Sequence, residues 1–187
     1  MGRVLSEQAA ARERRLLVVV GEPSGDAHAA RLVRALRELG AVRVRAVAGP
    51  ELRAAGAETI VPQEELAVIG FSGIVAKLPV ILRARKAILA DVARFQPDAV
   101  LLVDYPGFNL RLGPELQKRG VRVLYYIAPQ VWAWHAERAQ QMARWVDRLA
   151  VVFPFEEPLF KAAGVNATFV GHPLLDELAP ETDEATF

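Results

Sequence analysis

The chain has 187 residues, of which 52% are hydrophobic, so it can enclose a core of ordinary domain size. Its 23 basic and 22 acidic residues give a formal net charge of +1, which argues against a general nucleic-acid-binding protein, since such proteins carry a basic excess. Cysteine is absent, which excludes disulfides and thiolate metal sites.

The first 15 residues differ in character from those that follow. They include several arginines but no apolar segment, so they do not form a secretory signal, and we predict a flexible extension over residues 1–15. No apolar run elsewhere approaches the roughly 20 residues that are needed to span a bilayer. The folded domain is therefore expected to begin near residue 16.

Residues 16–20 form an apolar run that predicts a buried strand, and a glycine-containing loop and a helix over residues 27–39 follow it. This order is typical of the first unit of a doubly wound fold, although the loop matches neither the dinucleotide fingerprint nor a P-loop. Amides and side-chain oxygens in such a loop can hold anions or sugar hydroxyls, and a plain helix cap is the alternative. The candidate residues are Ser24, Gly25 and Asp26.

A strand over residues 42–48, a short helix and a strand over residues 59–61 come next. Residues 66–82 are then dense in apolar side chains, and basic residues follow them directly. Apolar residues beside basic ones can lie in a membrane interface against anionic head groups, and packing on the sheet is the alternative. Residues 79–95 predict a helix with Pro79 in its first turn and Leu82 facing inward.

The apolar run over residues 99–103 ends abruptly at Asp104, and Pro106-Gly107 breaks it. An unbroken run of this kind predicts a strand buried on both faces of a parallel sheet. Ligands bind at the carboxyl edge of such sheets, which makes Asp104 a candidate general base. Alternatively, Asp104 only accepts hydrogen bonds from loop amides. We expect Asn109 to cap the next helix with its side-chain oxygen.

After Asp104, a helix over residues 110–119 is expected to be kinked or to start late, because Gly113-Pro114 lies inside it. The strand over residues 121–127 leads into Gln130, Trp132 and His135, which can form a hydrogen-bonding or sugar-stacking wall or a core plug. No second histidine stands at ligand spacing, so we predict no metal and no cofactor. The remaining elements are helices over 137–146 and 154–163 and strands over 149–153 and 167–170. Together they predict a Rossmann-like three-layer α/β/α sandwich with six or seven mostly parallel strands.

Several strings in this sequence, taken in order, resemble the amino-terminal half of the lipid-A-disaccharide synthase family, over about residues 16–176. The strings are Gly21-Glu22-Pro23-Ser24-Gly25-Asp26, Glu65-Leu66-Ala67-Val68-Ile69-Gly70-Phe71, Asp104-Tyr105-Pro106-Gly107-Phe108-Asn109, Val131-Trp132-Ala133-Trp134, Pro154-Phe155-Glu156 and Gly171-His172-Pro173. Each string alone is weak, but six in order at compatible spacing are specific.

The resemblance implies one half of an inverting GT-B glycosyltransferase that needs no metal. Such enzymes join UDP-2,3-diacylglucosamine to 2,3-diacylglucosamine 1-phosphate at the inner face of the cytoplasmic membrane, as peripheral proteins. By resemblance Asp104 is the base that takes the proton from the acceptor's 6-hydroxyl. The other residues implied are Glu22, Ser24 and Asp26 in the loop that lines the cleft, Asn109 in the central motif, and Ile74, Val75, Leu78, Ile81 and Leu82 in an exposed patch for membrane and acyl chains.

Two residues depart from the family pattern, since members often carry an acidic residue where Gly73 stands and an arginine where His135 stands. We expect residues 16–173 to form the acceptor-binding domain and residues 174–187 to begin a linker to a nucleotide-binding domain, so that this chain alone is inactive. Two alternatives stay open. One is another GT-B enzyme, a UDP-N-acetylglucosamine transferase or epimerase. The other is a non-catalytic module that binds lipid or a partner protein.

Overall fold

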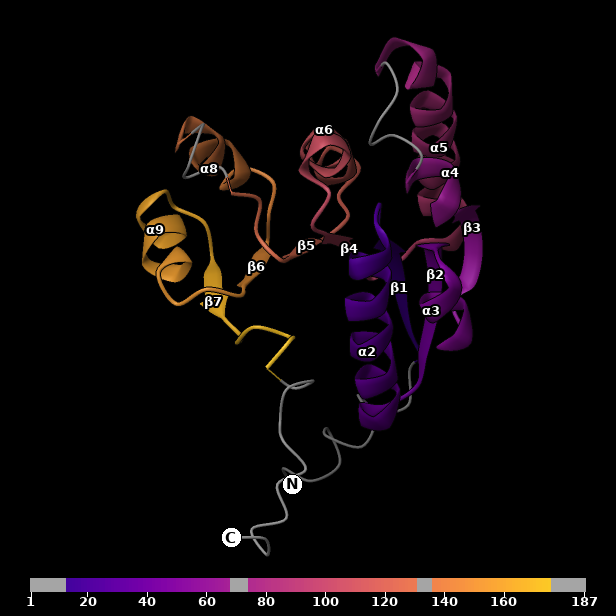
Figure 1. The fold of residues 1–187 in the computed structure, drawn as a ribbon, viewed down its shortest axis with the longest axis horizontal. Helices are drawn as coiled ribbons and strands as arrows, with labels where there is room; N and C mark the ends of the chain where they lie inside the picture. The colour runs from indigo at the N-terminus through magenta and orange to yellow at the C-terminus, as the bar shows by residue number, and fades with distance from the viewer. Residues whose placement is uncertain (1–12, 68–73, 131–135, 176–187) are drawn as a thin grey trace, which may run out of the picture.

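The computed structural model describes residues 13–67, 74–130 and 136–175. In these residues seven strands form one parallel sheet in the order β3-β2-β1-β4-β5-β6-β7 (Figure 1). The predicted α/β fold is therefore confirmed. The strands are β1 (Arg14–Val19), β2 (Val42–Ala48), β3 (Glu58–Pro62), β4 (Ala99–Val103), β5 (Val123–Tyr126), β6 (Arg148–Val151) and β7 (Ala167–Phe169).

The two central strands, β1 and β4, are the apolar runs of the sequence. They pair in parallel from Leu16 opposite Ala99 to Val19 opposite Leu102. Their side chains are buried because helices cover both faces, as continuous apolar strands require. β1 begins at Arg14, so Arg14 and Arg15 belong to the sheet and not to the predicted extension.

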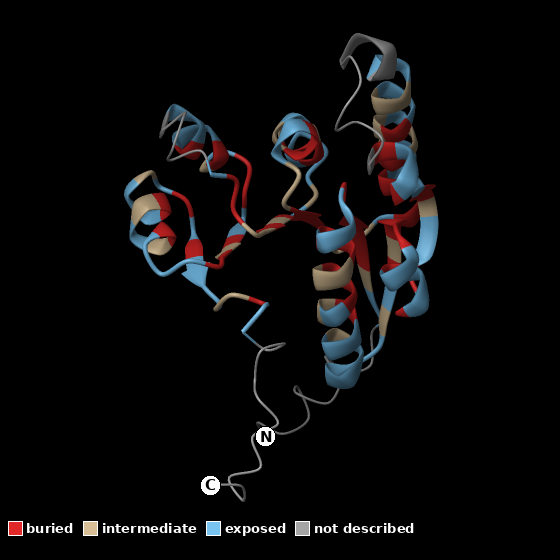
Figure 2. Cartoon of the chain, in the orientation of Figure 1, coloured by how far each residue is buried: buried red, intermediate tan, exposed pale blue. Residues whose placement is uncertain are grey.

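Helices cover the two faces of the sheet unequally. Side chains of α2 and α3 pack on one face, and side chains of α5, α6, α8 and α9 pack on the other, in two separate buried clusters (Figure 2). An ion pair between Arg85 and Glu115 joins α5 to α6. The helices are α2 (Pro23–Leu39), α3 (Pro50–Ala54), α4 (Gln63–Ala67), α5 (Ile74–Phe95), α6 (Pro106–Gln117), α8 (Ala136–Met142) and α9 (Glu156–Ala162).

The strand order reverses between β1 and β4. From β1 the chain continues toward β2 and β3, whereas from β4 it continues toward β5, β6 and β7. In folds of this type, ligands bind at the carboxyl edge of the sheet at the point where the strand order reverses. Glu22 follows β1 and Asp104 follows β4, so both predicted residues lie at this edge.

Two helices begin earlier than the sequence predicted. α2 starts at Pro23 and α6 starts at Pro106, and in both cases proline occupies the first helical position. Proline suits that position because its fixed φ matches the helix and its missing amide would have no partner there. Ser24, Gly25 and Asp26 are consequently part of the first turn of α2 and not of a loop.

α5 also starts early, at Ile74, which places Pro79 inside the helix and not in its first turn. The amino-terminal part of α5 projects beyond the carboxyl edge of the sheet (Figure 1). Among the described residues, no helix combines the length and apolar character required to cross a bilayer.

Two glycines of α6 offer a matched test of packing. A Cβ on Gly113 would lie 2.1 Å from the Trp145 ring, whereas a Cβ on Gly107 would meet nothing within 4 Å. Because the added methyl group would force the Trp145 ring out of its packed position, Gly113→Ala is expected to lower the free energy of unfolding by about 1–3 kcal/mol. Gly107→Ala should leave it unchanged or raise it by up to about 1 kcal/mol. Urea unfolding followed by circular dichroism measures both, and equal stabilities would contradict the packing described.

Candidate active site

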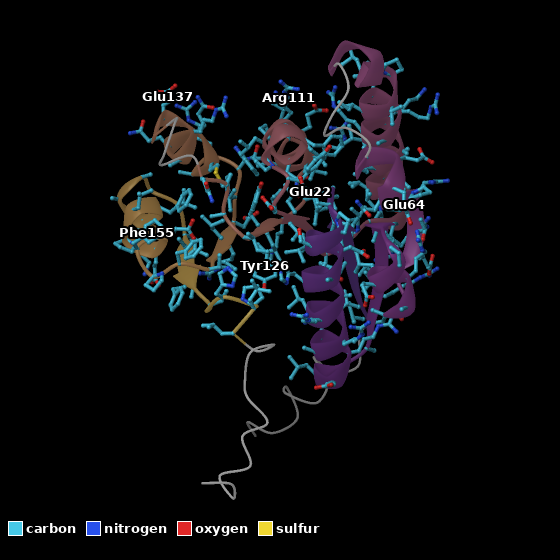
Figure 3. All side chains as sticks on the ribbon, viewed as in Figure 1. Glu22, Glu64, Arg111, Tyr126, Glu137 and Phe155 are labelled. Atoms are coloured by element: carbon cyan, nitrogen blue, oxygen red, sulfur yellow. The ribbon has the colours of Figure 1, made fainter. Side chains whose placement is uncertain are left out.

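The candidate site is formed where the loops after β1 and β4 meet. Asp104 is partly exposed, and Figure 3 shows Glu22 at the amino-terminal end of α2, beside the carboxyl edge of the sheet. Burial raises the pKa of the Asp104 carboxyl above its ordinary value, the negative charge of Glu22 raises it further, and a hydrogen bond from the Tyr105 amide lowers it in part. A carboxylate with a raised pKa is a stronger proton acceptor than an ordinary one.

The backbone of Asp104 is held in an unusual conformation. Asp104 and Tyr105 both have positive φ, at 44° and 48°, a region that few side chains other than Asn and Asp enter readily. The Asp104 amide donates to the Tyr126 carbonyl at 2.9 Å. Its carbonyl accepts from Asn109 Nδ2 at 2.8 Å and from Tyr125 Oη at 2.7 Å. These three bonds fix the direction in which the carboxylate leaves the strand.

Tyr125 is a positioning residue that the sequence analysis missed. It is 1% exposed on β5, opposite Leu102 of β4. Burial, with a smaller effect of the Asp104 charge, raises the pKa of Tyr125 well above its ordinary value, so the hydroxyl stays protonated and can donate. A tyrosine at an inward position of a predicted strand is the signal that could have found it, because a buried hydroxyl requires a polar partner.

Tyr105 connects the loop after β4 to the loop after β1. Its ring lies over Gly21, where a Cβ would come within 2.1 Å of the ring, and its hydroxyl donates to the Leu66 carbonyl at 3.4 Å. The buried side chain of Gln63 donates to the Gly21 carbonyl at 3.0 Å. Gly21 is therefore required for the close approach of the two loops that carry Glu22 and Asp104.

Asp26 has contacts that differ from those predicted. It is 1% exposed, and its carboxylate accepts from the amides of Gly49 and Glu51, both at 2.8 Å, and of Leu52 at 3.3 Å. These bonds cap the start of α3, so the carboxylate of Asp26 has a structural role: it joins α2 to α3. Gly25 is also buried, and an added Cβ would lie at an ordinary contact distance of 3.7 Å from Val103, so the packing of α2 on the sheet does not depend on a glycine there. Glu22 and Ser24 are exposed.

The sequence predicted that Asn109 caps a helix, and the structure shows that it does not. It lies fully buried inside α6, and its amide nitrogen donates back to the carbonyls of Val103 and Asp104. Because α6 starts at Pro106, Asn109 lies within its first turn and not ahead of it, and its side chain reaches back to the end of β4. Gln130 is exposed after β5. Trp132, Gly73 and His135 lie outside the described residues.

The predicted apolar patch is exposed only in part. Leu78 and Leu82 of α5 are 50% and 48% exposed, so Leu82 does not face inward as predicted. Ile81 is partly buried and packs against the core cluster instead. Ile74 and Val75 belong to α5, but their side chains lie outside what the structure describes.

Sequence comparison decides the family. The model for the lipid-A-disaccharide synthetase family matches residues 16–187. The chain belongs to the lipid-A-disaccharide synthetase family. Curated members include lipid-A-disaccharide synthases of Geobacter metallireducens, 45% identical over 91% of this chain, and of Geobacter sulfurreducens, 47% identical over 89% of it. Each alignment covers 44% of the relative, so the chain spans less than half the length of these relatives.

Solved structures of other proteins contain a fold similar to that of this chain. The UDP-GlcNAc 2-epimerase from Neisseria meningitidis matches with a TM-score of 0.63 at 11% identity, over 88% of this chain and 47% of that one. CalG4, the calicheamicin glycosyltransferase, matches with a TM-score of 0.52 at 18% identity, over 86% and 53%. At such identities the likeness concerns the fold alone, which corresponds to about half of each of those chains.

Proposed function

We propose that this chain is the acceptor-binding domain of an inverting hexosyltransferase that makes the lipid A disaccharide phosphate. The donor is UDP-2,3-diacylglucosamine and the acceptor is 2,3-diacylglucosamine 1-phosphate. The observation that carries the proposal is Asp104, a partly exposed carboxylate with a raised pKa at the point where the strand order reverses. Membership of the lipid-A-disaccharide synthetase family supports the choice of substrates.

In this mechanism Asp104 takes the proton of the acceptor's 6-hydroxyl as that oxygen attacks the anomeric carbon of the donor. The new carbon–oxygen bond forms on the face opposite the bond to UDP, which breaks, and the electron pair leaves with UDP. The chain itself holds the Asp104 carboxylate in one direction. It does so through the hydrogen bonds that the Asp104 carbonyl accepts from Asn109 and Tyr125 and the hydrogen bond that the Asp104 amide donates to the Tyr126 carbonyl. A correctly placed general base of this kind contributes about 10²- to 10⁴-fold to a rate.

A hybrid enzyme tests the proposed function. Residues 16–175 of this chain would replace the matching residues of the Geobacter sulfurreducens relative, and UDP release and disaccharide phosphate would be measured. We expect turnover by the hybrid and none by the 187-residue chain alone. A folded hybrid that releases no UDP, beside an active unmodified relative, would contradict the proposal.

The pH profile of the hybrid tests the electrostatic role of Glu22. Since Asp104 must be ionised to accept a proton, kcat/KM falls as the pH drops below its pKa. Removing the Glu22 charge by Glu22→Gln removes one cause of the raised pKa, so the acidic limb of the profile should shift to lower pH. Glu38→Gln, an exposed change at the far end of α2, serves as the control and should leave the limb in place. If the acidic limb does not move in Glu22→Gln, the Glu22 charge does not affect the pKa of Asp104.

We further propose that α5 brings the domain to the membrane surface as a peripheral protein. Leu78 and Leu82 are exposed one helical turn apart, and exposed Lys86 continues the same stripe. Exposed apolar side chains beside a cation favour an interface with anionic lipids. The amino-terminal part of α5 projects beyond the carboxyl edge of the sheet (Figure 1).

Vesicle sedimentation measures this contact. The double variant Leu78→Ser/Leu82→Ser is expected to reduce binding to vesicles that contain phosphatidylglycerol by about tenfold or more, because two leucines, each worth ~1.5 kcal/mol or more when buried, no longer enter the lipid. Leu39→Ser is the matched control, since Leu39 is 86% exposed at the opposite edge of the sheet. Equal binding by both variants would remove α5 from the contact.

A further inference from the structure

A groove between α6 and α8 lies next to the candidate active site and has no part in the mechanism above. Its volume is about 240 Å³, and it begins at Pro106 and Gly107, directly after Asp104-Tyr105. Trp145 and Met142 lie along it, and both are largely buried. The Trp145 ring packs directly against the backbone of Gly113, where a Cβ would come within 2.1 Å of it.

Two arginines give this groove its charge. Arg111 comes from α6 and Arg138 from α8, both are exposed, and no carboxylate of the described residues lines the groove between them. Among the described residues, neither guanidinium has an acidic partner, whereas Arg34, Arg43, Arg53 and Arg85 each pair with a glutamate. Figure 3 shows Arg111 on the outer surface of α6. Two unpaired guanidiniums across one groove match a phosphate, whose oxygens accept their paired N–H donors.

We propose that Arg111 and Arg138 bind the phosphate of a sugar 1-phosphate acceptor. This inference rests on the proposed function, because it uses the chemistry of that acceptor. The attacking 6-hydroxyl is carried on C5 and the phosphate on C1, and these two carbons flank the ring oxygen, so both groups lie on the same side of the pyranose ring. With the hydroxyl at Asp104, the phosphate is presented toward Pro106 and Gly107, where the groove with the two arginines begins. The groove thus fixes the acceptor in the orientation that presents its 6-hydroxyl, and it discriminates against sugars without the phosphate.

Binding to the 187-residue chain tests the proposal with soluble probes. N-acetylglucosamine 1-phosphate, N-acetylglucosamine and inorganic phosphate would each be titrated while the amide of Gly107 and the indole of Trp145 are followed by NMR. We expect the sugar phosphate to shift both signals and to bind more tightly than inorganic phosphate, and the neutral sugar to shift neither. Arg111→Gln and Arg138→Gln should each weaken binding by about tenfold or more, as for loss of a charge-assisted hydrogen bond.

Arg122→Gln is the matched control, since Arg122 is an exposed arginine at the amino-terminal edge of the sheet, and it should bind like the unmodified chain. Unchanged affinity in Arg111→Gln and Arg138→Gln, absence of binding, or equal affinity for inorganic phosphate would each overturn the proposal. In the hybrid enzyme the two variants should raise the KM for the acceptor with little change in kcat. A hybrid that turns over while the chain shows no such binding refutes this site alone. Binding without turnover refutes the proposed function instead.

Discussion

An Asp104→Asn variant of the hybrid enzyme is expected to lose about 10²- to 10⁴-fold in kcat, because the amide cannot accept the proton of the acceptor hydroxyl. The substitution keeps the shape of the side chain. It also keeps the backbone bonds to Asn109, Tyr125 and Tyr126, which involve only the main chain of residue 104. Asparagine tolerates positive φ as well as aspartate does, so the loop should be preserved. Steady-state UDP release measures the loss.

Two controls separate chemistry from folding in this experiment. The KM for the acceptor and the thermal unfolding curve of Asp104→Asn should match those of the unmodified hybrid, and Glu38→Gln should retain full kcat. Turnover within a few fold of the unmodified hybrid would show that Asp104 is not the base, whatever its position in the fold. A loss of stability together with activity would instead assign Asp104 to the architecture of the loop.

The largest expected effect on stability comes from Asp26→Ala, which should lower the free energy of unfolding by about 3 kcal/mol, since three backbone amides lose their acceptor in a buried site. Asp26→Asn should also destabilise the fold, because it replaces one acceptor oxygen by an NH₂ group that faces an amide donor. Ser24→Ala, an exposed change in the same turn of α2, should stay within about 0.5 kcal/mol of the unmodified chain. Urea unfolding of the chain gives all three values. An Asp26→Ala variant as stable as Ser24→Ala would show that the cap of α3 is dispensable.

The sequence predicted the sheet well because its strands are short apolar runs that end at turn residues. β4 has the predicted bounds, 99–103, as an apolar run that is buried almost throughout, and β2 has the predicted bounds, 42–48, as an alternating segment that becomes fully buried toward its end. The helix starts were less accurate. Proline was treated mainly as a break, whereas Pro23 and Pro106 occupy first helical positions, and this difference moved Asp26 and Asn109 from loops into helices.

The contacts around Asp104 were beyond the reach of sequence analysis. The positive φ of Asp104 and Tyr105 depends on bonds to residues of β5 and α6, which only the folded sheet brings together. Ile81 and Leu82 are neighbours in sequence and both apolar, yet one packs on the core and the other is exposed, because the rotation of α5 is set by its tertiary contacts. The groove that contains Arg111 and Arg138 lies between α6 and α8, which are separated in the sequence by β5, so no local sequence pattern predicts it.

The ion pair between Arg85 and Glu115 connects the helix proposed to meet the lipid with the helix that carries Arg111. A pair of this kind adds little stability, about 0–1 kcal/mol, but it shows that the two helices are direct neighbours. With α5 resting on a bilayer, as proposed, α6 is the helix beside it. An acylated sugar could arrive by lateral diffusion with its chains still in the leaflet, which turns a three-dimensional search for an insoluble substrate into a two-dimensional one.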